Sequence, residues 1–97
     1  MNIYEEAIQT FGREKQLDMV VEECAELIQA IQKYKRDHNK TENLIEEMVD
    51  VEIMLNQLKY IFHEEYKNLS FNLINKKLER LGEKVEKEKA RQEVPFH

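Results

Sequence analysis

The chain contains two short blocks of acidic residues whose spacing could place carboxylates side by side. Glu23 and Glu26 are three residues apart, and so are Glu47 and Asp50. Residues three apart in an α-helix lie on one face, so each block is expected to present two neighbouring carboxylates. Carboxylate oxygens are ligands that Mg²⁺ and Mn²⁺ prefer. The two blocks therefore predict a divalent metal site, provided that their helices meet.

Each acidic pair lies within a line of apolar residues at helical spacing. Met19 precedes the first pair and Ala30 follows it, while Met54 and Ile61 follow the second pair. A single Glu-x-x-Glu pair is common on solvated helices and would usually be only a charged surface. Two pairs on successive helices, each in an apolar line, favour a semi-buried cluster of four carboxylates. Such a cluster would need protons or cations to neutralise it.

Other metal sites fit the sequence less well. A di-iron bundle uses Glu-x-x-His motifs, but no glutamate lies three residues before His38, His63 or His97. Structural zinc needs several cysteine or histidine ligands at close spacing, and Cys24 is the only cysteine. A calcium loop of the EF-hand type needs a glycine, which residues 36–41 lack. A hard cation held by carboxylates is the remaining prediction.

Four helices are expected to position these residues. They span about residues 3–10, 13–35, 42–62 and 68–89. Gly12 should separate the first two, because glycine weakens a helix by about 1 kcal/mol relative to alanine. The polar stretch 36–41 should make the second and third helices antiparallel neighbours. Asn39 or Thr41 should cap the third helix, with Glu42 completing a capping box with Asn39.

Apolar residues recur at helical spacing and predict the core. On the second helix the predicted core face comprises Leu17, Val20, Val21, Cys24, Leu27, Ile28, Ile31 and Tyr34. On the third helix it comprises Leu44, Met48, Val51, Leu55, Leu58 and Phe62. The third helix also carries a second apolar stripe, which comprises Ile45, Val49, Ile53 and Tyr60. We expect another subunit to cover that second stripe, in a homodimer or homotetramer.

Composition and charge restrict the fold and the partners. The 97 residues include two glycines and one proline, and 36% are charged, which is typical of a helical bundle. We expect an all-α antiparallel bundle of about four helices, one domain over residues 1–97, with a solvated or frayed segment over 83–97. A net charge of −5 disfavours a nucleic-acid polymer as partner. The absence of a long apolar run, of a signal peptide and of a second cysteine predicts a cytoplasmic protein without a membrane span.

The order of the motifs resembles the MazG-like family of all-α nucleoside triphosphate pyrophosphohydrolases. Glu22-Glu23-x-x-Glu26-Leu27 and Glu46-Glu47-x-x-Asp50-Val51 are similar to the EExxE and ExxD signature of that family. Lys77-Leu78-Glu79-Arg80 is similar to the basic K-L-x-R segment that follows these helices. The resemblance extends over about residues 17–81, and it implies a compact single-domain member with the MazG-like helical fold.

The resemblance implies a magnesium-dependent enzyme, with Mn²⁺ as an alternative metal. The enzyme would hydrolyse a nucleoside triphosphate to the monophosphate and pyrophosphate. The implied metal ligands are Glu23, Glu26, Glu47 and Asp50. Glu22 and Glu46 would orient these ligands or the attacking water, and Lys77 and Arg80 would contact phosphate oxygens.

Other residues would have to recognise the base and sugar. Asn56, one and a half turns beyond Asp50, is one candidate, and Tyr4 and Phe11 are others. Three alternative functions stay open: a non-enzymatic helical homodimer that acts as an interaction or regulatory module, a fold that binds nucleotide without turnover, and phosphoribosyl-ATP pyrophosphohydrolase. The last ranks lower, because that enzyme typically has Tyr-His after its aspartate where this chain has Ile53-Met54.

Overall fold

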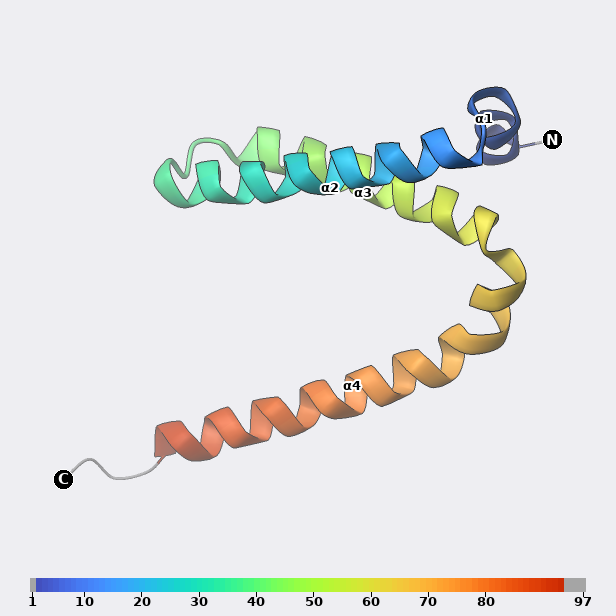
Figure 1. Ribbon diagram of the computed structural model, residues 1–97. Helices are drawn as coiled ribbons and strands as arrows, with labels where there is room; N and C mark the ends of the chain where they lie inside the picture. The colour runs from blue at the N-terminus through green and yellow to red at the C-terminus, as the bar shows by residue number, and fades with distance from the viewer. Residues whose placement is uncertain (1, 94–97) are drawn as a thin grey trace. The chain divides into compact units, whose positions relative to one another are not determined.

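The computed structural model describes residues 2–93, and all of their regular secondary structure is helical. The helices are α1 (Ile3–Phe11), α2 (Arg13–Arg36), α3 (Thr41–Ile61) and α4 (His63–Glu93) (Figure 1). This confirms the predicted all-α class. No helix in the described range has the length and apolar character needed to cross a membrane. The chain divides into two compact units, Met1–His63, which contains α1 to α3, and Glu64–His97, which contains almost all of α4.

The break between α1 and α2 lies at Gly12, as predicted. Gly12 has a φ of 88°, a backbone conformation that residues with a side chain rarely adopt. Its N–H donates to the carbonyl of Ile8 at 2.9 Å, and its carbonyl accepts from the N–H of Gln16 at 3.1 Å. This glycine therefore ends one helix and starts the next. At the other end of α1, the Asn2 side chain caps the helix by accepting from the N–H of Glu5 at 3.0 Å.

The connection between α2 and α3 is short, as predicted, but its hydrogen bonds differ from the prediction. The carboxylate of Asp37 accepts from the N–H of Asn39 at 3.0 Å and holds the turn. The N-cap of α3 is Lys40, which makes no side-chain capping hydrogen bond. The hydroxyl of Thr41 donates to a carbonyl within the connection at 3.0 Å. The predicted capping by Asn39 or Thr41, with Glu42, is therefore wrong, because α3 begins at Thr41 and its N-cap position is taken by Lys40.

α2 and α3 run antiparallel and pack along one seam, which is the main interhelical contact of the first unit (Figure 1). Within residues 2–93, the buried residues are Gln16, Ala30, Met54 and Gln57, and all four belong to these two helices. Glu23 and Glu47 are half-buried in the same seam. The two acidic lines predicted from the sequence therefore face each other.

The stripe predicted as the core of α2 lies beside the seam, and much of it is exposed. Val21, Ile28 and Ile31 are 70%, 62% and 41% exposed. The other members are half-buried: Leu17, Val20, Cys24, Leu27 and Tyr34. The predicted core face is therefore wrong for its most exposed members. Because α2 contacts α3 through the line that contains Glu23 and Ala30, helix geometry turns this stripe away from α3.

α3 shows the same difference from the prediction. Met48, Leu55 and Phe62 are exposed. The half-buried members of its predicted core are Leu44, Val51 and Leu58. The second apolar stripe is also exposed at Ile45, Val49 and Ile53, and half-buried at Tyr60. The subunit contact expected for this second stripe stays a prediction.

α4 is a single long helix and accounts for the described part of the second unit. It begins at His63 instead of Asn68, and it continues through Gly82 to Glu93 instead of Lys89. Residues 83–93 are exposed but helical, so the expected fraying is not seen there. Residues 94–97, on which the rest of that prediction falls, lie outside the described range. The apolar stripe of α4 is exposed throughout: Phe71, Ile74, Leu78, Leu81 and Val85.

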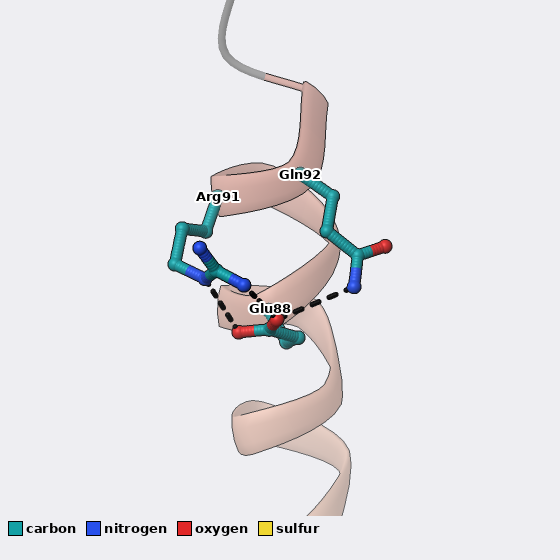
Figure 2. Close-up of polar contacts among 3 residues, drawn as sticks. All are labelled: Glu88, Arg91 and Gln92. Atoms are coloured by element: carbon teal, nitrogen blue, oxygen red, sulfur yellow. Dashed lines mark hydrogen bonds and ion pairs between the residues drawn. The ribbon is translucent and has the colours of Figure 1, made fainter.

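The last turns of α4 are linked by polar side chains. The carboxylate of Glu88 accepts two hydrogen bonds from Arg91, at 2.8 and 2.5 Å, and one from Gln92 at 3.2 Å (Figure 2). These hydrogen bonds hold the pKa of Glu88 below its ordinary value, and those from Arg91 contribute most. Because the residues are solvated, the pair adds little to stability.

Candidate metal centre

Three of the predicted metal ligands come together across the α2–α3 seam. Glu23 and Glu26 extend from α2 and Glu47 from α3, and one carboxylate oxygen from each lies within 4.8 Å of the other two. Oxygens bound to one Mg²⁺ at about 2.1 Å lie roughly 3 to 4.2 Å apart. Small rotamer adjustments would therefore let one cation contact all three oxygens.

The seam positions of the cluster explain why it is closed on one side and open on the other. Gln16, Glu23 and Ala30 recur every seven residues along α2, and the two outer members are each 1% exposed. Glu47 has the same relation to the buried Met54 on α3. Glu26 lies almost one turn from Glu23, and it is exposed. A ligand would therefore reach the cluster from the Glu26 side.

The electrostatics of the cluster show that its negative charge is uncompensated. Glu23 and Glu47 each have a buried oxygen, Oε2, that has no hydrogen-bond partner. Loss of hydration raises the pKa of both carboxyl groups above the ordinary value. The charges of Glu26 and Asp50 and a hydrogen bond with Glu26 raise both pKa values further. Since a buried carboxylate without a partner is costly, this arrangement favours either a bound proton or a bound cation.

Asp50, the fourth predicted ligand, lies beside the three-oxygen cluster. Its charge acts on Glu23 and Glu47, but its carboxylate is outside the set of mutually close oxygens. Asp50 is exposed and borders a shallow, open hollow on α3. The hollow is lined by Glu42, Ile45, Glu46, Val49 and Asp50. Metal binding by Asp50 would require its side chain to turn toward the seam.

The two residues predicted to orient ligands or water are at the edge of the site. Glu46 is exposed, and its charge raises the pKa of the neighbouring Glu47. Glu22 is exposed on α2, next to Glu23 in sequence. Both carboxylates are accessible to solvent. Their catalytic role stays a prediction.

Asn56, a predicted substrate contact, is engaged by α1. Its amide donates to the hydroxyl of Tyr4 at 3.1 Å. The ring of Tyr4 lies 5.9 Å from that of Tyr60, whose hydroxyl accepts a hydrogen bond from Asn2. The six residues between Asp50 and Asn56 turn Asn56 by about 120° around α3. Two candidates for base recognition, Asn56 and Tyr4, are therefore joined to each other at the α1–α3 contact, and their role with substrate is untested.

The third aromatic candidate lies at the end of α1, and the predicted phosphate contacts belong to α4. Phe11 is 52% exposed at the end of α1, where the ammonium of Lys15 lies 6.0 Å from its ring centre. Lys77 and Arg80 are exposed on α4, in the other compact unit. They are three residues apart, so they share one face of that helix. Their contact with phosphate stays a prediction.

Two buried glutamines extend the polar seam, and sequence reasoning missed them. Gln16 and Gln57 are 1% and 5% exposed, and the amide oxygen of each has no hydrogen-bond partner. The amide nitrogen of Gln16 lies 3.5 Å from the sulfur of Met19. A signal was present, because Gln16 precedes Glu23 by seven residues and Gln57 follows Asp50 by seven. The acidic lines thus continue as polar lines for two further turns.

Comparison with known proteins identifies no relative, since no family model, curated protein or solved structure matches the chain. The function is therefore inferred from the carboxylate cluster and the order of the motifs.

Proposed function

We propose that the chain is a Mg²⁺-dependent nucleoside triphosphate pyrophosphohydrolase of the MazG-like kind, which hydrolyses a (d)NTP to the (d)NMP and pyrophosphate. The observation that carries the proposal is the cluster of Glu23, Glu26 and Glu47 across the seam. Its buried oxygens lack partners, and loss of hydration, followed by the charges of neighbouring carboxylates, raises the pKa of Glu23 and of Glu47. The motifs follow the same order along the chain as in that family. This resemblance favours pyrophosphate release among the reactions that use a hard cation.

Charge explains why an acidic protein would need a metal for this substrate. The chain carries a net charge of −5, and a triphosphate is itself strongly anionic. When bound, Mg²⁺ would neutralise phosphate charge and lower the pKa of a water molecule. Glu23, Glu26 and Glu47 would hold the metal. The free thiol of Cys24 is consistent with a reducing compartment such as the cytoplasm.

The remaining residues would act on water and phosphate. Glu46 and Glu22, both exposed beside the cluster, would orient the attacking water or accept its proton. Asp50 would join the ligand set by turning its side chain. Lys77 and Arg80 are the candidate phosphate contacts, as the resemblance to the K-L-x-R segment implies.

Pyrophosphate release tests the proposal directly. A panel of canonical and modified NTPs and dNTPs should be assayed with Mg²⁺, with Mn²⁺ and with EDTA. We expect metal-dependent release from at least one nucleotide. Glu47→Gln should reduce it by roughly 100-fold or more, because one metal ligand loses its charge. Glu14→Gln, the same change at an exposed position of α2, should retain full activity.

Three outcomes would overturn the assignment. Undiminished release from Glu47→Gln would remove the cluster from the mechanism. No release from any nucleotide, together with no rise in melting temperature on addition of Mg²⁺, would favour the interaction module, whose acidic residues only solvate its surface. A metal-dependent rise in melting temperature without turnover would favour a nucleotide-binding protein.

A further inference from the structure

α4 carries an exposed apolar stripe at heptad spacing. Its members recur at intervals of three and four residues and are between 43% and 73% exposed: Phe71, Ile74, Leu78, Leu81 and Val85. At 100° per residue they lie within about 80° of the helix circumference. A stripe this narrow is typical of a coiled-coil seam, whereas a helix that packs on a core or inserts into a membrane surface has a wider apolar face. The spacing therefore indicates that the stripe receives a single partner helix.

Only basic and neutral residues border the middle of this stripe. When the stripe residues are positions a and d of the heptad, positions e and g flank them. The flanking residues here are Asn75, Lys77, Gly82 and Lys84. Glu79 and Glu83, the acidic residues of the same turns, lie about 120° or more from the centre of the stripe. The surface beside the stripe is therefore positively charged, although the whole chain has a net charge of −5.

Lys77 and Lys84 are available to a partner. Both are exposed, and within residues 2–93 neither takes part in an ion pair or a side-chain hydrogen bond. The basic residues nearer the end of α4 are already engaged. The ammonium of Lys89 lies 3.7 Å from a carboxylate oxygen of Glu86, and Arg91 binds Glu88 (Figure 2). Carboxylates at the e and g positions of a facing helix would pair with Lys77 and Lys84, so the stripe is complementary to an acidic amphipathic helix.

The same charges disfavour pairing of α4 with α4 of a second copy. In a parallel pair, position g of one helix faces position e of the other, so Lys84 would meet Lys89 of the second copy. In an antiparallel pair, position g faces position g, so Lys77 would meet Lys84 of the second copy. Like charges repel in both arrangements. The flanks therefore favour a partner of opposite charge over the same helix.

We propose that the stripe of α4 binds an acidic amphipathic helix of another protein, whose carboxylates pair with Lys77 and Lys84. From Phe71 to Val85 the stripe extends over two heptads, or about 21 Å. A contact of this length buries less than the roughly 800 Å² per partner of a typical stable interface, so we expect a reversible complex. The inference does not depend on the proposed hydrolase activity. Because Lys77 is also a candidate phosphate contact, Lys84 is the better position for a charge reversal.

Binding of synthetic three-heptad peptides to the full chain, measured by fluorescence anisotropy, tests the stripe. The acidic probe has leucine at a and d and glutamate at e and g, and the basic probe has lysine in place of glutamate. We expect the acidic probe to bind at least about 10-fold more tightly than the basic probe. Leu81→Gln should weaken binding of the acidic probe by at least about 10-fold, as loss of a central apolar contact does. Leu73→Gln, the same change at a residue that is 49% exposed but lies outside the stripe, should leave binding unchanged.

Charge reversal tests the pairing with carboxylates. Lys84→Glu should weaken binding of the acidic probe several-fold and strengthen binding of the basic probe. Lys76→Glu makes the same change on the helix surface opposite the stripe, so it should alter neither affinity. All four substituted side chains are exposed, so the variants should fold, and circular dichroism checks that they do.

Equal binding of the two probes, or no binding of either at high micromolar concentration, would overturn the proposal. So would a folded Leu81→Gln variant that binds the acidic probe like the wild type, or a Lys84→Glu variant with unchanged preference between the probes. Co-sedimentation of the chain with phosphatidylserine vesicles, abolished by Leu81→Gln and without binding of either probe, would also overturn it and assign the stripe to an anionic membrane surface.

Discussion

The seam of the α2–α3 hairpin and the apolar stripe beside it reverse the usual distribution, in which apolar residues are buried and polar residues are exposed. Where the two helices touch, the seam holds the carboxylates of Glu23 and Glu47 and the buried amides of Gln16 and Gln57. In the apolar stripe beside it, large residues such as Ile28 are exposed. Polar groups in a seam cost free energy unless they bind something, which supports the proposal of a metal centre there.

The free energies of burial show why polar groups in the seam need an explanation. Fully burying a side chain such as Leu or Ile contributes about 1.5 to 3 kcal/mol, and a buried polar group without a partner costs about 1 to 3 kcal/mol. The four partnerless oxygens of the seam are those of Gln16, Glu23, Glu47 and Gln57. A cation at the carboxylates would relieve part of this cost.

The largest effect on stability is expected at Met54, the larger of the buried apolar side chains in the seam. Met54→Ala should lower the free energy of unfolding by about 2 to 5 kcal/mol, because it leaves a cavity between the helices. Ile53→Ala, at a neighbouring residue that is 44% exposed, should cost under about 1 kcal/mol. Urea denaturation of the full chain measures both. Equal losses would mean that Met54 is no better buried than its neighbour.

A smaller effect of opposite sign is expected at Gln57. Gln57→Met keeps the length of the side chain and removes an amide oxygen that has no partner, so it should stabilise the chain by about 1 kcal/mol. Gln32→Met, on the exposed surface of α2, should change stability by less than about 0.5 kcal/mol. The same denaturation experiment applies. A destabilised Gln57→Met variant would show that the seam amide has a partner in solution.

The smallest effect is the pH dependence of the metal-free chain, because Glu23 and Glu47 are only half-buried and water screens their interaction. The pKa of each is raised on folding, first by loss of hydration, so the folded chain binds protons more tightly than the unfolded chain. Their contribution to stability is therefore complete below the ordinary pKa of about 4.5 and is lost as pH rises through the raised values. In EDTA, the titration of these two groups should lower the melting temperature as pH rises above about 4.5.

The double variant Glu23→Gln/Glu47→Gln provides the control for this pH dependence. It lacks both titrating groups, so its melting temperature should fall less over the same range. If the wild type and the double variant have parallel profiles, other carboxyl groups control the pH dependence.

Periodicity and turn residues in the sequence were sufficient to predict much of the fold. Gly12 marked the first break, and the polar connection 36–41 made α2 and α3 antiparallel. The boundary between α3 and α4 was missed because Phe62 ends one helix and His63 begins the next with no glycine or proline between them. A boundary between two helices of that kind leaves no signal in the amino-acid composition.

The candidate site was predicted better than the core. Residue spacing fixes which side chains share a face, so the convergence of Glu23, Glu26 and Glu47 followed once the acidic lines met. Spacing does not decide which face of a helix meets its neighbour. Because α2 and α3 each carry an apolar line and an acidic line, the apolar stripe that includes Ile28 was assigned to the core within one chain.

The most direct test of the central claim is a calorimetric titration of the full chain with Mg²⁺ and with Mn²⁺, for wild type and Glu47→Gln. We predict saturable binding to the wild type, because the buried oxygens of Glu23 and Glu47 lack hydrogen-bond partners that a cation would replace. Binding to Glu47→Gln should be at least about 10-fold weaker. Absence of binding to the wild type, or equal affinity of the two proteins, would contradict the assignment of the seam as a metal centre.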